Sequence, residues 1–338
     1  MVPLQENSNY STVGTMEDQV ERVQVKSWAV PSDADAVRLD AFLRKCLPQL
    51  SRGALASAID NKFFWTGGRP GRKGEKLRAG QIVTFRGPQE WLFTQPSPAK
   101  QLDVPIIYED AYCLVVNKPA GMATHGFSGK DTQTLANFLV AYRPDLLTVG
   151  KSRWEPGLVH RLDRETSGLV LVVKTPAAFD SLRLQFRRRE VKKTYWALVW
   201  GAAAAAGTID FPIAHDSRDR RRMRALKNSD RRHEPVRHWQ ALTHFKRISR
   251  RDGLSLVEVE MATGVTHQIR VHLAAMGHPI VGDVLYGQAG SETFGLNRHF
   301  LHARALEFRH PKDGRRIKVE AELPKVLQQV LSHLKMKF

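Results

Sequence analysis

The sequence of 338 residues predicts an α+β fold, with a largely antiparallel sheet in a main domain and a small α/β module before it. Two observations carry this prediction. Strand patterns dominate the chain after residue 104, and helical patterns fall between them irregularly, which argues against a doubly wound sheet. The run from Leu169 to Val173 is apolar at every position, which is typical of a strand buried on both faces.

The part of the chain before the main domain divides by composition. Residues 1–24 lack apolar periodicity, so we expect a disordered tail. Residues 25–86 predict the small module, with two short helices and with strands at 63–65 and 81–85. The apolar helical positions are Leu39, Phe42, Leu43, Cys46 and Leu47, then Leu55, Ala58 and Ile59. Residues 87–104 contain three prolines and predict a linker.

Residues 105–338 form the predicted main domain. Its clearest strand patterns lie at 112–116, 194–200 and 257–261. Helical patterns lie between the strands, and Gly277 is suited to end the last helix. The expected helices are 131–142, 177–189 and 266–276.

Polar side chains crowd against the start of the buried strand, namely His160, Arg161, Asp163, Arg164 and Glu165. Removing an ionised group from water is costly unless the group is paired. The cluster is therefore either an ion-pair network that fastens a loop or a reactive centre.

The charge balance indicates a polyanionic partner. The chain has 52 Lys and Arg against 34 Asp and Glu, a formal net charge of +18. Nucleic acid is the first candidate partner for such an excess, and a basic surface kept for solubility is the alternative. The basic residues cluster at 183–193 and at 215–237.

Several classes of site are not expected. Cys46 and Cys113 show no C-x-x-C spacing, so we expect buried thiols in a reducing compartment and no zinc ribbon. His267 and His272 are five residues apart on a predicted helix and cannot face one metal ion, so we expect no metal site. No apolar stretch has the length of a membrane span and the N-terminus is polar, so we expect a cytoplasmic protein.

Five segments together resemble the RluA-type pseudouridine synthases. They are NKPAGMATH (117–125), GLVHRLDRETSGLVLVVKT (157–175), KKTYWALVWG (192–201), ATGVTHQIRVHLAAMGHPIVGDVLYG (262–287) and LHARALEFRHP (301–311). The resemblance covers residues 105–325 in the right order. Residues 38–86, with RLDAFL, LPQLSR and KLRAGQIV, resemble the small alpha-L RNA-binding module of a ribosomal protein.

The family resemblance implies a bent, mixed sheet and a uridine-isomerising enzyme that needs no cofactor. It implies that Asp163 is the catalytic carboxylate and that Arg270 keeps it ionised. Tyr195 would stack on the uracil and accept the proton from C5, and Leu301 would line the pocket. Arg161 would enter the RNA stack as the target nucleotide is flipped out. A plain buried salt bridge between Asp163 and Arg270 is the alternative.

The remaining binding residues are expected from position and charge. His160 and Arg164 lie in the same motif as Asp163, and we expect them to contact the substrate. Arg220, Arg221 and Arg222 lie in the second basic cluster, where we predict a mobile arm that becomes ordered on RNA and makes affinity fall with salt. Val265 departs from the family pattern, which usually has arginine there.

We expect a monomeric isomerase acting on structured RNA, without a nucleotide cofactor or membrane contact. The alpha-L module favours large-subunit ribosomal RNA as the substrate, because a second RNA-binding surface suits a larger target. Alternatives are a tRNA pseudouridine synthase of the same family, a non-catalytic RNA-binding or ribosome-assembly factor, and an enzyme that releases the base. The mass of the RNA product separates isomerisation from base release.

Overall fold

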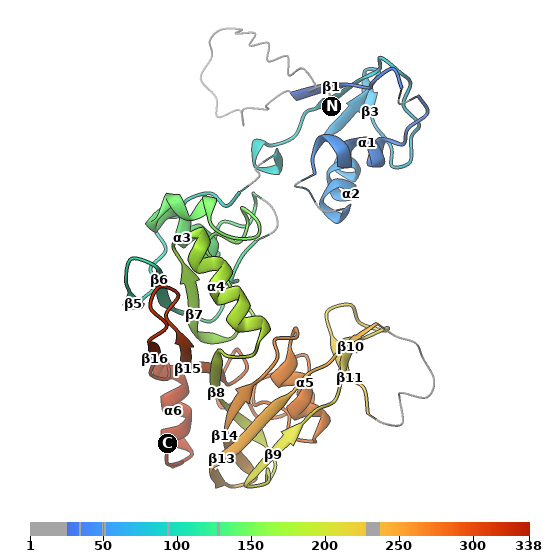
Figure 1. The fold of residues 1–338 in the computed structure, drawn as a ribbon. Coiled ribbons are helices and arrows are strands. Elements are labelled where there is room, and N and C mark those ends of the chain that lie inside the picture. The colour runs from blue at the N-terminus through green and yellow to red at the C-terminus, as the bar shows by residue number, and fades with distance from the viewer. Residues whose placement is uncertain are drawn as a thin grey trace, which may run out of the picture. The chain divides into compact units, whose positions relative to one another are not determined.

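The computed structural model describes residues 26–338 except 34, 49, 51, 93–94, 127–128 and 228–236. The predicted tail, 1–24, lies outside the described residues. The described chain forms two compact units (Figure 1). The first runs to Pro98 and includes His125–Thr132, and the second contains Ala99–Thr124 and Gln133–Phe338.

The first unit is a four-stranded antiparallel sheet with two helices. Its strands are β1 (Lys26–Ala29), β2 (Phe64–Thr66), β3 (Arg69–Pro70) and β4 (Ile82–Phe85), in the order β1-β4-β2-β3. Helices α1 (Leu39–Cys46) and α2 (Arg52–Asp60) bury the apolar positions that the sequence marks, Leu39 and Leu55 among them. The segment expected as a linker begins with a short helical turn, η1 (Gln89–Leu92), whose Trp91 packs into this core.

The second unit is built on a nine-stranded sheet in the order β5-β6-β7-β15-β8-β14-β13-β9, with β16 paired to β15. All neighbouring strands are antiparallel except β7 and β15, which run parallel. The prediction of a mixed, largely antiparallel sheet is therefore confirmed. The strands are β5 (Ile106–Glu109), β6 (Cys113–Lys118), β7 (Ser167–Val173), β8 (Lys192–Trp200), β9 (Ala206–Ile209), β13 (Thr243–Arg251), β14 (Leu254–Met261), β15 (Leu301–Arg309) and β16 (Arg316–Glu320).

Strand β7 is buried along its whole length, as its unbroken apolar run predicts. Val170 and Val172 belong to one core cluster, and Leu169, Leu171 and Val173 belong to another. The alternation of strand side chains puts these two sets on opposite faces of the sheet. The first core also takes in α3 (Leu135–Tyr142), η2 (Pro144–Thr148), α5 (Gln268–Ala275) and α6 (Lys325–His333), and the second takes in α4 (Pro176–Arg187).

The basic segment expected to be a mobile arm is partly ordered as a sheet. Strands β10 (Ile213–His215), β11 (Met223–Ala225) and β12 (His238–Trp239) pair antiparallel in the order β11-β10-β12. The expectation of a long loop throughout 215–237 is thus wrong for the described part. Ile213 and Met223 explain this, because they give the hairpin its own apolar contacts. Residues 228–236 lie outside the described residues.

No helix in the described part of the chain has the length and apolar character to cross a lipid bilayer.

Candidate active site

The loop that carries Asp163 is fastened from several sides. It leads directly into β7, so its backbone polar groups near the core must find partners inside the protein. Thr124 Oγ1 donates to the carbonyl of Leu162 and accepts from its N–H, at 2.8 and 3.1 Å. The Lys118 ammonium donates to the carbonyls of Pro119, Met122 and Arg164. Lys118 is fully buried, and this burial lowers its pKa to about 7.

A second set of contacts holds the end of this loop against the start of β15. Thr166 Oγ1 lies 2.8 Å from His299 Nε2, and Ser167 Oγ lies 2.9 Å from His302 Nδ1. The buried Arg298 donates to Ser167 Oγ and to the carbonyl of Leu301. Asp163 therefore projects from a loop that is held on one side by residues at and after the end of β6 and on the other by residues at the start of β15.

Arg270 joins Asp163 to a second carboxylate, Asp283, which is not among the residues expected in the site. Its Nη1 donates to Asp163 Oδ2 at 3.1 Å. Its Nε and Nη2 form a bidentate pair with Asp283, at 2.7 and 2.9 Å. The guanidinium side chain is 6% exposed, the Asp283 side chain 0% and the Asp163 side chain 23%. Asp283 thus orients Arg270 from the buried side, and Asp163 faces the opening.

Arg270 and Asp283 each favour the charged form of the other. Burial by itself raises the pKa of Asp283, but the hydrogen bond and the charge of Arg270 outweigh it, and the net pKa is lowered. Burial likewise opposes the charge of Arg270, while Asp283 and Asp163 together raise its pKa. Arg270 is therefore a fixed cation beside Asp163. The motif GDVLYG could have identified Asp283 in the sequence, because it places an acid 13 residues after Arg270.

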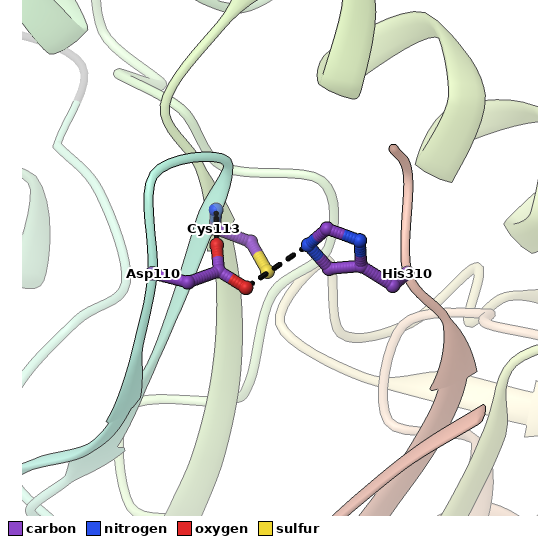
Figure 2. Close-up of side chains that lie close together, drawn as sticks. All are labelled: Asp110, Cys113 and His310. Carbon is purple, nitrogen blue, oxygen red and sulfur yellow. Dashed lines mark hydrogen bonds and ion pairs between the residues drawn. The ribbon is translucent and has the colours of Figure 1, made fainter. Parts of the chain in front are cut away.

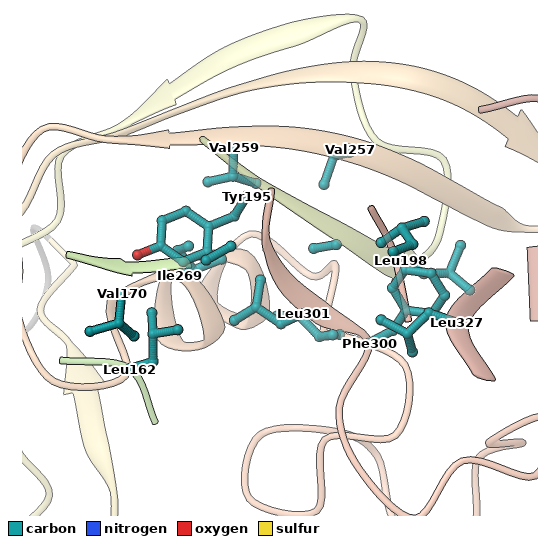
Figure 3. Packing of buried hydrophobic residues seen from close by; sticks show 14 of the residues in the cluster. Leu162, Val170, Tyr195, Leu198, Val257, Val259, Ile269, Phe300, Leu301 and Leu327 are labelled. Carbon is teal, nitrogen blue, oxygen red and sulfur yellow. The ribbon is translucent and has the colours of Figure 1, made fainter. Parts of the chain in front are cut away.

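A pocket opens at Asp163, and several expected site residues line it. The lining residues are Arg161, Leu162, Asp163, Thr166, Tyr195, Met261, Val265, His267, Gln268, Ile269, Arg270 and Leu301. Tyr195, Leu162 and Ile269 pack near one another in the core beside Leu301 (Figure 3). Among these lining residues, all within the described chain, Asp163 is the only acid. A pair of carboxylates of the kind that glycoside hydrolases use is therefore not part of this lining.

Tyr195 presents its ring to the pocket from β8. The residue is 4% exposed, and it shares a strand face with Ala197 and Val199. Burial, together with the negative charge of Asp163, raises the pKa of Tyr195 well above its usual range. The phenol therefore keeps its proton near neutral pH, so Tyr195 is a poor base as long as the pocket is empty.

Two expected binding residues lie elsewhere. His160 Nε2 accepts a hydrogen bond from the Leu171 N–H, and its ring packs on Phe186. Burial lowers the pKa of His160 to about 3, so it is a neutral structural group. Arg164 is exposed and donates to the Gly121 carbonyl. Neither residue lines the pocket, because the His160 ring is held against β7 and the Arg164 side chain is held at Gly121.

The three arginines of the basic segment also have separate positions. Arg220 is exposed and Arg221 pairs with Asp219 at 2.8 Å. Arg222 lies over the ring of Tyr286, with its Cζ 5.3 Å from the ring centre. None of the three lines the pocket in the described structure.

One cluster of possible metal ligands lies far from the pocket. Asp110, Cys113 and His310 approach one another at the end of β15 opposite to Leu301 (Figure 2). Asp110 Oδ1 accepts from the N–H groups of Tyr112 and Cys113, and Oδ2 accepts from Tyr108. Burial also raises the pKa of the Cys113 thiol to about 12. Protein groups thus satisfy the carboxylate, and we interpret the cluster as a clamp between the turn after β5 and the end of β15.

The geometry of the pocket suits a flat, uncharged ring. Tyr195, Leu301 and Ile269 offer apolar walls, and a single carboxylate paired with a buried cation stands beside them. Such a carboxylate can add to an electrophilic carbon or accept a proton.

The chain is similar to one protein family model, to related sequences and to solved structures. A family model described as RNA pseudouridylate synthase matches residues 112–275. An RNA pseudouridine synthase of Chloroflexus aurantiacus is 41% identical over 318 residues, which are 93% of this chain and 94% of the relative. The ribosomal large subunit pseudouridine synthase D of Xanthomonas campestris is 37% identical over 319 residues, covering 90% of this chain and 91% of the relative. The solved structure of human RNA pseudouridylate synthase domain containing 1 has a TM-score of 0.53 and 27% identity, covering 71% of this chain and 97% of that one.

Proposed function

The chain belongs to the RNA pseudouridine synthase family, and from this premise we propose that it isomerises a uridine of large-subunit ribosomal RNA with Asp163 as the catalytic carboxylate. As an isomerase it breaks the glycosidic bond between C1′ and N1 of a uridine. The uracil then turns while it stays bound, and C5 joins C1′. A hydrogen leaves C5 and one is gained at N1, so the composition of the RNA does not change.

The contact between Asp163 and Arg270 is the observation that carries the assignment of the carboxylate. Asp163 Oδ2 lies 3.1 Å from a buried guanidinium, which compensates a negative charge on this carboxylate when a bound base excludes water from the pocket. An anionic carboxylate is needed whether it adds to the base, adds to the sugar or removes a proton. Asp163 has this environment and faces the pocket, whereas Asp283 is buried behind Arg270.

Two further residues take roles around the flipped base. Tyr195 stacks on the uracil, and it can accept the proton from C5 only after losing its own, a step that its raised pKa opposes. Arg161, exposed at the rim, fills the gap in the RNA stack, and Leu301 supports the other side of the base. Unstacking costs a few kcal/mol, which contacts in the pocket offset.

The preference for large-subunit ribosomal RNA rests on relatives and on charge. Three relatives named ribosomal large subunit pseudouridine synthase D are 37%, 36% and 33% identical to this chain. We propose that residues 25–86 form an RNA-binding module that gives a second grip on a large RNA. The net charge of +18 supplies the long-range attraction.

Pseudouridine mapping tests the substrate. We expect cells without this gene to lose pseudouridine at one or more positions of large-subunit ribosomal RNA. Wild-type protein restores these positions, and the Asp163→Asn variant does not. Loss confined to tRNA would contradict the ribosomal assignment and leave a tRNA synthase. An unchanged map of total RNA would contradict the proposed function.

Replacing Tyr195 with phenylalanine tests the proton-transfer role. Tyr195→Phe keeps the stacking ring and removes the hydroxyl, so we expect single-turnover pseudouridine formation to slow about 10²-fold with RNA affinity retained. Trp196→Phe is the matched control, because the next residue of β8 faces the other side of the sheet. A rate equal to wild type for Tyr195→Phe would leave Tyr195 with stacking alone.

A further inference from the structure

The hairpin of the basic segment is attached directly to the helix that carries Arg270. We define the arm hairpin as residues 213–225, which include β10, β11 and the turn between them. Ile213 and Met223 of the hairpin form a small apolar cluster with Val271 of α5. Val265 and Tyr286 pack against the same cluster. A change in the position of the hairpin therefore acts on residues that neighbour the catalytic pocket.

Tyr286 lies where the arm hairpin and the active site meet. Its hydroxyl oxygen accepts a hydrogen bond from the Met223 N–H at 2.8 Å. The same hydroxyl lies 2.8 Å from Nδ1 of His267, which lines the pocket. The ring centre is 5.1 Å from the Arg270 Cζ and 5.3 Å from the Arg222 Cζ. One side chain thus contacts the hairpin twice and the active site twice.

The contact with His267 leads on to Asp163. His267 is the N-cap residue just before α5 and has a left-handed conformation, with φ of 57°. Burial lowers the pKa of His267, so its ring is neutral and Nδ1 can accept the phenol proton. The remaining ring proton is then on Nε2, which lies 3.9 Å from Asp163 Oδ2. His267 and Arg270 therefore flank Asp163, and Tyr286 contacts both of them.

The two arginines over Tyr286 provide a way for RNA to act on this arrangement. Arg222 belongs to the hairpin and Arg270 to the active site, and both are cations near one aromatic ring. A phosphate bound by Arg222 would neutralise it and remove its repulsion of Arg270.

On the basis of the proposed function, we propose that Tyr286 is a positioning residue that couples RNA contact at the arm hairpin to the orientation of Arg270 and His267 around Asp163. RNA held by the hairpin then increases the rate of the chemical step in addition to the affinity. This role differs from that of a phosphate contact, which changes affinity alone.

The test separates rate from affinity in the full-length protein. Single-turnover pseudouridine formation is measured at saturating RNA, and the dissociation constant is measured by filter binding. We expect Tyr286→Phe, which keeps the ring and loses both hydrogen bonds, to lower the saturated rate about tenfold without changing the dissociation constant. The control Tyr142→Phe removes an exposed hydroxyl that binds Glu109, and we expect neither quantity to change.

A double-mutant cycle with Arg222→Gln measures the coupling itself. Arg222→Gln should weaken binding and also lower the saturated rate, and in the Tyr286→Phe background its effect on the rate should be smaller. The inference is overturned if Tyr286→Phe changes only the dissociation constant or the melting temperature, or if the two effects on the rate multiply. Wild-type protein that forms no pseudouridine in ribosomal or transfer RNA would contradict the proposed function instead.

Discussion

The Asp163→Asn variant is expected to form no measurable pseudouridine while it binds RNA as the wild type does. In the wild type, Arg270 Nη1 lies 3.1 Å from Asp163 Oδ2. The amide of asparagine has nearly the same shape as the carboxylate, and its oxygen can still accept this hydrogen bond. The amide cannot act as an anionic nucleophile or base, so a loss of about 10⁴-fold or more is expected. The RNA-binding surfaces are unchanged.

Single-turnover assays and filter binding check this prediction together. Asp145→Asn is the matched control, because this aspartate is exposed, pairs with Arg143 and lies outside the pocket lining. Its rate should equal that of wild type. Turnover by Asp163→Asn within tenfold of wild type would contradict the catalytic role, and joint loss of turnover and of folded protein would indicate a structural salt bridge.

The Arg270→Lys variant is expected to lose both activity and stability, although the charge is kept. Lysine offers one ammonium, so it cannot reproduce the bidentate pair with Asp283 and the bond to Asp163 at the same time. The Asp283 side chain is 0% exposed, and a buried carboxylate with an incomplete partner costs about 3–5 kcal/mol of unfolding free energy. We expect the saturated rate to fall about 10³-fold, because Asp163 loses its fixed cation.

Urea unfolding and single-turnover rates measure the two effects separately. The double variant Arg270→Met with Asp283→Leu replaces the buried ion pair by apolar groups and should recover most of the lost stability. It should remain inactive, because Asp163 then has no cation beside it. Activity recovered along with stability would contradict the electrostatic role of Arg270 and leave a packing role only.

Local pattern predicted the buried strand and most of the helices, and the family resemblance brought forward the centre of the site. The apolar run of β7 predicted a strand buried on both faces, and α1, α2, α4 and α5 lie where helical spacing indicated them. The pocket contains Asp163, Tyr195 and Arg270, which the family resemblance had brought forward. The arm hairpin was missed because its strands are short and charged residues dominate its turn.

The sequence by itself determined which residue types are available for chemistry and which segments form strands and helices, since both depend on neighbours within a few positions. Only the tertiary structure decided how Asp163 meets Arg270, 107 residues away, and that Asp283 supports this pair from behind. It also decided that His160 accepts a hydrogen bond from the buried strand β7 and that Tyr286 contacts the arm hairpin. These outcomes depend on the path of the chain between distant segments, and packing of the sheet, not local propensity, fixes that path.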